Sequence, residues 1–299
     1  MSDTKSGNKN PASAAKKPVQ PAKFDLNETI AKEPVFDVKP FTPRKVEEAE
    51  PVIAEGMDLS GKTKIVFVNG RGKTGKTTFL RWAAERALTG NRPILMADLD
   101  PTNASFSSYF QDVARPNTDD PAGVAQWMQR FIEYAVENQT TAVLDLGGGD
   151  TTLRETAAEM PGFASAIAEA GAVPVLISLV GSQVDDLAPI ATLRDRGFSP
   201  DARAIVFNEA SKEIGHTRDQ SFGRLLTSAV VVDEVTDGAV PLWMPRLNAA
   251  AAVESRRSLF SAARDGLTKP PLGMFDRSKV RTWLEAMDRR FAGIMSWLP

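Results

Sequence analysis

The chain has 299 residues, of which 42% are hydrophobic and 25% charged, and its formal net charge is −2. This length allows one large α/β domain with appendages or two small domains, and the near-neutral charge requires any nucleic-acid surface to be local. The sequence contains no cysteine and a single histidine, His216. It therefore excludes a disulfide framework, a thiolate zinc site, a cysteine nucleophile and a multi-histidine metal site within one chain. No apolar run approaches the roughly 18 residues of a transmembrane helix, and no secretory signal is visible, so we expect a cytoplasmic protein.

Residues 1–60 are predicted to be a disordered tail, because they hold seven of the twenty prolines and show no helix or strand periodicity. The first 24 residues carry five lysines against one acid, and the second part ends in the acidic run Glu47–Glu50. Two interpretations stay open for this tail. It is either a solubilising linker or a basic arm that contacts DNA, a membrane or a partner protein.

The folded part is predicted to begin near Lys62 with strands and helices in alternation. The strands are short apolar runs, and the helices have apolar residues at steps of three and four. The expected strands are Lys64–Val68, Pro93–Ala97, Thr140–Leu146, Val173–Val180 and Arg203–Asn208, with a sixth at Val230–Val235. The expected helices are Thr78–Leu88, Pro121–Asn138, Asp186–Arg196, Ala249–Arg264 between Asn248 and Gly266, and the amphipathic Val280–Leu298. Continuous apolar strands between helices indicate a mostly parallel sheet with both faces covered.

The segment Gly70–Thr77 (GRGKTGKT) fits the phosphate-loop pattern G-x-x-x-x-G-K-[ST]. A predicted strand runs into it and a predicted helix runs out of it, so main-chain N–H groups and the positive end of the helix would surround phosphate oxygens. We expect Lys76 to reach the β- and γ-phosphates and the Thr77 hydroxyl to ligate Mg²⁺. The other residues expected to hold ATP here are Gly70, Gly72, Lys73, Thr74, Gly75 and Thr78. The alternative is a glycine-rich turn that binds nothing. The predicted fold class is a three-layer Rossmann-like P-loop NTPase, α/β with a mostly parallel sheet.

Carboxylates follow two of the predicted strands. Asp145 ends one strand, before the run Gly147–Asp150, and Asp98 and Asp100 follow another. In open α/β sheets, ligands lie at the carboxyl ends of the strands. Acids that converge there suit Mg²⁺ and an attacking water, although either group could be a solvated loop carboxylate.

Together these motifs resemble the ParA/MinD family of deviant Walker ATPases, in its ParA-like branch. Residues 71–78 (RGKTGKTT) align with K-G-G-x-G-K-[ST]-T, and residues 98–105 (DLDPTNAS) resemble D-x-D-P-Q-x-x-x-S. Weaker similarities are Asn208, where the family keeps an adenine-reading asparagine, and Pro241, in a segment like the one that closes over the base. The resemblance implies an ATPase domain over residues 61–266, and residues 267–299 are then a C-terminal extension.

The resemblance implies a role for each acid and cation of the site. Asp98 and Asp145 would hold the metal with Thr77, and Asp100 would position the attacking water. Hydrolysis would be slow and partner-stimulated. Family members dimerise face to face around two ATP molecules, and a signature lysine reaches the partner's nucleotide. Arg71 stands at that position here, and it either acts in trans in an ATP-dependent homodimer or has a changed role.

Two surfaces of the C-terminal region are candidates for contact with a partner. ParA proteins bind DNA non-specifically through a basic surface, which the resemblance places at Arg246, Arg256, Arg257 and Arg264. A solvated helix face is the alternative. MinD-like proteins touch membranes with a C-terminal amphipathic helix, but for Val280–Leu298 we favour packing on the domain.

We therefore expect a ParA-like positioning ATPase that uses ATP and Mg²⁺ and switches between monomer and dimer. Its cargo would be plasmid or chromosome DNA, a conjugative transfer system or a large complex. Two alternatives stay open: an accessory ATPase subunit of a membrane machine such as polysaccharide export, and an ATP-dependent metabolic enzyme on the same fold.

Overall fold

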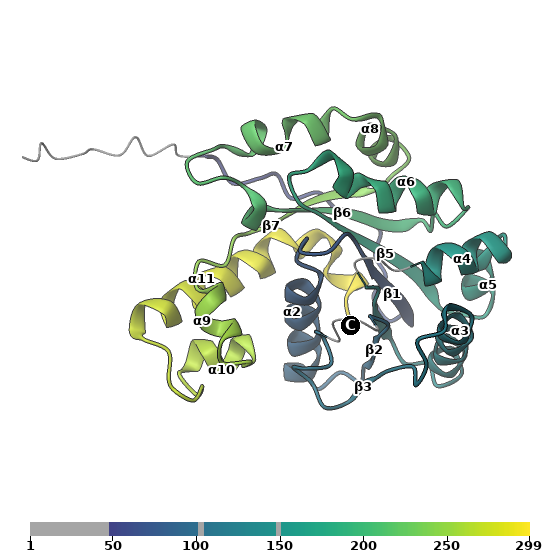
Figure 1. Cartoon of the computed structure of the whole chain (residues 1–299), viewed down its shortest axis with the longest axis horizontal. Coiled ribbons are helices and arrows are strands. Elements are labelled where there is room, and N and C mark those ends of the chain that lie inside the picture. Colours follow the sequence, from purple (N-terminus) through teal and green to yellow (C-terminus); the bar gives the residue numbers. More distant parts are fainter. Residues whose placement is uncertain (1–47, 101–104, 148–150) are drawn as a thin grey trace, which may run out of the picture. The chain divides into compact units, whose positions relative to one another are not determined.

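Within the described residues, a seven-stranded parallel sheet forms the centre of the protein (Figure 1). The computed structural model describes residues 48–100, 105–147 and 151–299, which belong to one unit spanning residues 46–299. The strands are β1 (Lys64–Asn69), β2 (Leu95–Asp98), β3 (Val113–Ala114), β4 (Ala142–Asp145), β5 (Val173–Val180), β6 (Ala202–Asn208) and β7 (Val240–Met244). They lie in the order β3-β2-β4-β1-β5-β6-β7, and every neighbouring pair is parallel.

Helices cover both faces of the sheet, which confirms the predicted three-layer α/β fold (Figure 1). Alternate side chains of β1 show why: Val66 and Val68 are buried in one core, and Ile65 and Phe67 in the other. The first core is covered by α2 (Lys76–Thr89), α9 (Ala250–Glu254), α10 (Phe260–Asp265) and α11 (Met274–Arg290). The second is covered by α3 (Pro121–Glu137), α4 (Thr152–Glu159), α5 (Phe163–Glu169) and α6 (Ala188–Asp195). A third cluster joins α6 to α7 (Arg218–Leu226) and α8 (Ala229–Thr236).

The apolar face of the C-terminal segment is buried. Trp283 and Met287 of α11 belong to the same core as β1 and α2. Phe291, just beyond α11, packs its ring 5.5 Å from that of Phe79 and 5.1 Å from that of Trp82. Large buried side chains such as these each stabilise a fold by about 2 kcal/mol. Among the described residues no helix is both long and apolar enough to cross a lipid bilayer.

Residues 48–60, here called the strap, contact the end of the chain. The Gly56 N–H donates to the Gly293 carbonyl oxygen at 2.9 Å, and the Trp297 indole N–H donates to the Met57 carbonyl oxygen at 2.7 Å. Leu59 is buried. The folded part therefore begins earlier than the predicted boundary at residue 61. The rest of the predicted tail, residues 1–47, lies outside the described residues.

The prediction of a strand at Val230–Val235 is wrong, because this segment lies in α8. The hydroxyl of Ser228 caps the helix by accepting a hydrogen bond of 3.3 Å from the Val231 N–H. One side of the helix packs on α7 and the other faces solvent, with Val232 47% exposed. Tertiary packing thus overrides the β-propensity of the valines, and the edge strand next to β6 is β7 instead.

The predicted helix Ala249–Arg264 is two helices, α9 and α10. Arg257 adopts a left-handed conformation (φ 44°), and Leu259 at the start of α10 is extended. The break turns the first N–H groups of α10 toward Glu85 of α2, whose carboxylate accepts hydrogen bonds from the N–H groups of Phe260 (2.7 Å) and Ser261 (2.9 Å). Gly266 ends α10 in the left-handed conformation, as expected of a C-cap glycine.

Candidate nucleotide-binding site

The phosphate loop needs glycine at two positions. Gly70 and Gly75 have φ values of 144° and 99°. A Cβ atom on Gly70 would lie 2.3 Å from the Leu179 carbonyl oxygen, and one on Gly75 would lie 2.4 Å from Asn208 Nδ2. Both positions therefore exclude a side chain. Lys73, where the family pattern has glycine, also has a positive φ of 69°, which costs a non-glycine residue about 1 kcal/mol.

Lys76 turns its side chain back over this loop. Its Nζ donates to the carbonyl oxygens of Gly70 (2.8 Å) and Arg71 (3.2 Å), and the residue is 8% exposed. Helix α2 begins at Lys76, after Gly75, and no side chain caps it. The ammonium group and the amino end of a helix therefore converge on one small volume, an arrangement suited to a polyphosphate.

A cavity of about 790 Å³ opens beside the loop, at the carboxyl ends of the strands. Its lining includes loop residues, polar residues and acids: Gly72, Lys73, Gly75, Lys76, Thr77, Thr78, Asp100, Ser105 and Asp145. The other lining residues are mostly apolar: Asn208, Ala210, Met244, Pro245, Leu247, Ala250, Glu254 and Trp283. A cavity lined by both charged and apolar side chains suits a ligand that has a charged part and an apolar part. Another cavity of about 810 Å³ lies at the amino ends of β1 and β5, away from the loop.

Oxygen ligands for a metal line this cavity. The Thr77 and Ser105 hydroxyl oxygens are 2.8 Å apart, and Asp145 at the end of β4 is almost fully buried. Among the described residues, His, Cys, Asp and Glu side chains form no group of three or more that could hold a metal ion. The donors present nevertheless fit Mg²⁺, which is commonly held by one or two carboxylates together with substrate phosphates.

Asp98 and Asp100 have different surroundings. Asp100 lines the cavity, whereas Asp98 does not. The Asp98 carboxylate accepts hydrogen bonds from the main-chain N–H groups of Asp100 (3.1 Å) and Ser107 (2.9 Å), and the residue is 1% exposed. Asp98 therefore does not reach the cavity; its carboxylate instead binds the main chain of the residue that does, Asp100.

Asn208 and Pro245 line the cavity, whereas Pro241 does not. The Asn208 side-chain amide donates to the Thr74 carbonyl oxygen at 2.8 Å, so it holds the phosphate loop. Pro241 lies inside β7, in register with Ile205, and does not line the cavity. Pro245 lines it instead, and the Trp283 indole N–H fixes that proline by donating to its carbonyl oxygen at 2.9 Å.

Arg71 does not line the main cavity. Its Nη1 lies 3.6 Å from an Asp185 carboxylate oxygen and 3.7 Å from an Asp186 carboxylate oxygen, both in the 3₁₀ helix η1 (Val184–Leu187). The Arg71 side chain is 46% exposed. With Gly70 it lines a smaller neighbouring cavity of about 210 Å³.

The four arginines of the expected DNA surface differ in their surroundings. Arg246 donates to main-chain carbonyl oxygens, including that of Ala210 at 3.0 Å. Arg256 donates to the Ala252 carbonyl oxygen at 2.7 Å, and Arg264 is paired with Asp265. Arg257 is exposed. Much of the charge expected for DNA therefore contacts groups of the chain itself.

The sequence motifs do not predict several residues that line the cavity, among them Met244, Pro245, Leu247, Glu254 and Trp283. Ser105 is the last residue of the segment 98–105 that resembles D-x-D-P-Q-x-x-x-S, but the resemblance assigns it no role at the site. The only signal for Pro245 was a second proline four residues after Pro241. Trp283 gave none, because apolar residues at helical spacing are usually core residues.

No family model and no curated protein matches the chain. Among solved structures, the chain is similar to the MinC:MinD cell division protein complex of Aquifex aeolicus, with 10% identity, a TM-score of 0.43, and coverage of 75% of this chain and 96% of that chain. It is also similar to chloroplast FtsY of Physcomitrella patens (14%, TM-score 0.41, 76% and 66% coverage). A third similar structure is the MinD cell division protein of Aquifex aeolicus (12%, TM-score 0.39, 75% and 98% coverage). At these identities and TM-scores the likenesses identify no function for the chain.

Proposed function

We propose that the chain binds ATP with Mg²⁺ in the cavity beside the phosphate loop and hydrolyses it slowly. The observation that carries this proposal is the position of Lys76, whose ammonium group lies 2.8 Å from the Gly70 carbonyl oxygen within the loop. An ammonium group beside the uncapped amino end of α2 suits the β- and γ-phosphates. The apolar wall that includes Met244 and Pro245 suits a planar base.

The residues near the γ-phosphate then have different roles in hydrolysis. Thr77 and Asp145 would hold Mg²⁺, which would supply positive charge beside the phosphate oxygens. Asp100 orients the attacking water. Asp98 is a positioning residue, because its carboxylate holds the Asp100 N–H at 3.1 Å. Phosphoryl transfer depends mainly on such positioning and electrostatic stabilisation, so a small displacement of Asp100 slows hydrolysis.

We further propose a cycle between a monomer and an ATP-bound dimer that positions or partitions a cargo. The exposed Arg71 side chain supports this part. In the dimer, the guanidinium leaves Asp185 and Asp186 and reaches the partner's nucleotide. Contact with DNA would involve Arg257 more than Arg246, whose side chain is bound to main-chain carbonyl groups.

Nucleotide binding is tested by calorimetry with MgATP. Lys76→Ala is expected to lower the affinity at least a hundredfold. The matched control is Lys279→Ala, which removes an exposed lysine paired with Asp276 on α11. Equal affinities for wild type and Lys76→Ala would overturn the proposal.

The dimer is tested by light scattering with ATP and Mg²⁺. Asp100→Ala is expected to accumulate as an ATP-bound dimer because hydrolysis no longer releases it, whereas Lys76→Ala stays monomeric. Monomer profiles for wild type and both variants would refute the dimer and leave nucleotide binding intact.

A further inference from the structure

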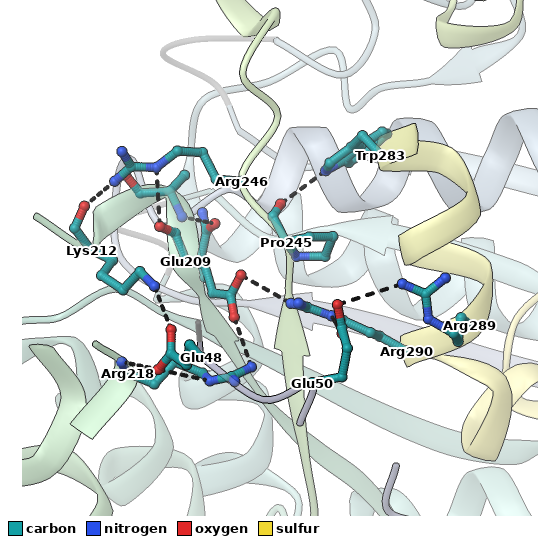
Figure 2. Close-up of polar contacts among 12 residues, drawn as sticks. Glu48, Glu50, Glu209, Lys212, Arg218, Pro245, Arg246, Trp283, Arg289 and Arg290 are labelled. Atoms are coloured by element: carbon teal, nitrogen blue, oxygen red, sulfur yellow. Dashed lines mark hydrogen bonds and ion pairs between the residues drawn. The ribbon is translucent and has the colours of Figure 1, made fainter. Parts of the chain in front are cut away.

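The first described residues of the strap lie against a set of basic side chains (Figure 2). This set, here called the basic groove, is Lys212, Arg218, Arg289 and Arg290, and Glu209 pairs with Arg218 and Arg290. It joins the 3₁₀ helix η2 (Glu209–Ser211) and α7 to the end of α11. Glu48 and Glu50 of the strap point into it from the same short stretch of chain (Figure 2).

Glu48 and its neighbour Ala49 are bound through both side chain and main chain. Lys212 Nζ lies 2.7 Å from one Glu48 carboxylate oxygen, and Arg218 Nε lies 3.2 Å from the other. The Arg218 main-chain N–H also donates to the Glu48 carboxylate, and the Arg218 guanidinium donates to the Ala49 carbonyl oxygen. The bond to the Ala49 carbonyl oxygen is a contact with the peptide backbone and does not depend on a particular side chain.

Glu50 is held at the other end of the groove. Arg290 Nε donates to its carboxylate at 3.0 Å, and Arg289 Nη2 lies 3.6 Å from it. The hydrogen bond from Arg290 holds the pKa of Glu50 below its ordinary value. Burial alone would raise the pKa of Glu48, but the hydrogen bonds from Lys212 and Arg218 outweigh burial and lower it. The groove therefore favours the ionised form of both carboxyl groups.

The groove carries more positive charge than its own acid can balance. Glu209 lies 3.2 Å from Arg218 Nη1 and 2.9 Å from Arg290 Nη1, so a single carboxylate faces two guanidinium groups whose side chains are only 11% and 10% exposed. Arg246 donates to the carbonyl oxygens of Glu209 (3.3 Å) and Ala210 (3.0 Å), and so holds the segment that carries Glu209. Without the strap, these cations would face a single carboxylate, so the basic groove would attract an acidic occupant.

We propose that the basic groove is a docking site for an extended acidic peptide with carboxylates two residues apart, which Glu48-Ala49-Glu50 occupies in cis. A partner protein with the same pattern displaces the strap. In an extended chain, side chains two residues apart lie on the same side and about 6.5 Å apart, so a single short peptide can present both carboxylates to the basic groove. The occupant seen in the structure is a peptide segment, held by Arg218 through the Glu48 carboxylate and the Ala49 carbonyl oxygen.

The groove adjoins the nucleotide cavity. Glu209 directly follows Asn208, which holds the Thr74 carbonyl of the phosphate loop. The docking proposal does not depend on nucleotide binding, however, and its test is made without nucleotide. The two proposals therefore fail or hold separately.

The test measures binding of a fluorescent peptide with the sequence of residues 46–54 to the full chain by anisotropy. Glu48→Gln with Glu50→Gln is expected to bind it at least tenfold more tightly than the wild type, because the cis occupant is weakened. Adding Arg290→Gln should reverse the gain at least tenfold. Glu55→Gln, an exposed strap residue, is the matched control and should behave as wild type.

A second measurement needs no variant. Excess peptide added to the wild-type chain should speed amide hydrogen exchange at Gly56, and a peptide with glutamine at the positions of Glu48 and Glu50 should not. Equal peptide affinity in wild type and the double variant, or binding that survives Arg290→Gln, would overturn the proposal. A gain of DNA binding by the double variant without a gain of peptide binding would overturn it in favour of nucleic acid.

Discussion

The side-chain amide of Asn208 donates a hydrogen bond of 2.8 Å to the main-chain carbonyl oxygen of Thr74. This bond ties the end of β6 to the middle of the phosphate loop, across 134 residues of sequence. The Asn208 side-chain oxygen also accepts from the Ala210 N–H at 2.9 Å, so the asparagine is fixed at both ends. The shape of the loop thus depends on a neighbouring strand as well as on its own glycines.

Asn208→Ala should lower the affinity for MgATP about tenfold, since a buried hydrogen bond contributes roughly 1 kcal/mol and its loss leaves the loop less constrained. Asn208→Asp should weaken binding further, because it replaces the amide donor with a negative charge near the Thr74 carbonyl oxygen. Calorimetry on the three proteins measures both effects. Unchanged affinity in both variants would mean that the loop keeps its shape without this bond.

Gly75→Ala should lower the free energy of unfolding by about 1–3 kcal/mol, because φ is positive and the new Cβ would lie 2.4 Å from Asn208 Nδ2. Gly72→Ala is the matched control on the same loop, since a Cβ there meets nothing within 4 Å. Urea denaturation compares the two variants. Similar losses in both would show that the Asn208 contact is not the cause.

Glu85→Ala should destabilise the fold by about 3 kcal/mol. It leaves two N–H groups of α10 without acceptors. It also removes a negative charge that acts on the buried Arg81 guanidinium, which lies over the Tyr109 and Phe260 rings at 3.6 Å and 4.1 Å. Glu85→Gln keeps an acceptor oxygen and should cost less. Burial raises the pKa of the Glu85 carboxyl, so the neutral amide is the milder change. Equal losses in the two variants, measured by denaturation, would contradict this account.

Acidification should release the strap. The pKa values of Glu48 and Glu50 are lowered in the folded chain from an ordinary value of 4.5. Lowered acid pKa values give a stabilisation that is fully present above the ordinary pKa and is lost as the pH falls through the folded value. The melting temperature of wild type should therefore exceed that of Glu48→Gln with Glu50→Gln above this pH, and the gap should close below it. A gap that stays constant down to strongly acidic pH would argue against the ion pairs.

Arg71→Ala should abolish the proposed ATP-dependent dimer and leave the affinity for MgATP within about twofold, because its guanidinium pairs with Asp185 and Asp186 and does not line the main cavity. Light scattering and calorimetry separate the two properties. A large loss of affinity in the monomer would instead assign Arg71 to the nucleotide of its own chain.

The sequence by itself determined the phosphate loop and the parallel α/β fold. Both are local patterns: glycine, lysine and threonine at fixed spacing between an apolar strand and a helix, and continuous apolar strands that must be buried on both faces. The valines of α8 led to the wrong prediction of a strand, because packing on α7 outweighs their β-propensity.

Only the tertiary structure decided which residues meet around that loop. Pro245 rather than Pro241 lines the cavity, Asp98 lies behind Asp100, and the strap contacts residues more than 230 positions away. No local spacing encodes such contacts, because each depends on how distant elements pack against the same sheet. The physical reason is that the path of the backbone in three dimensions decides which side chains meet. The spacing of apolar residues along the sequence indicates only which face of a helix or strand is buried.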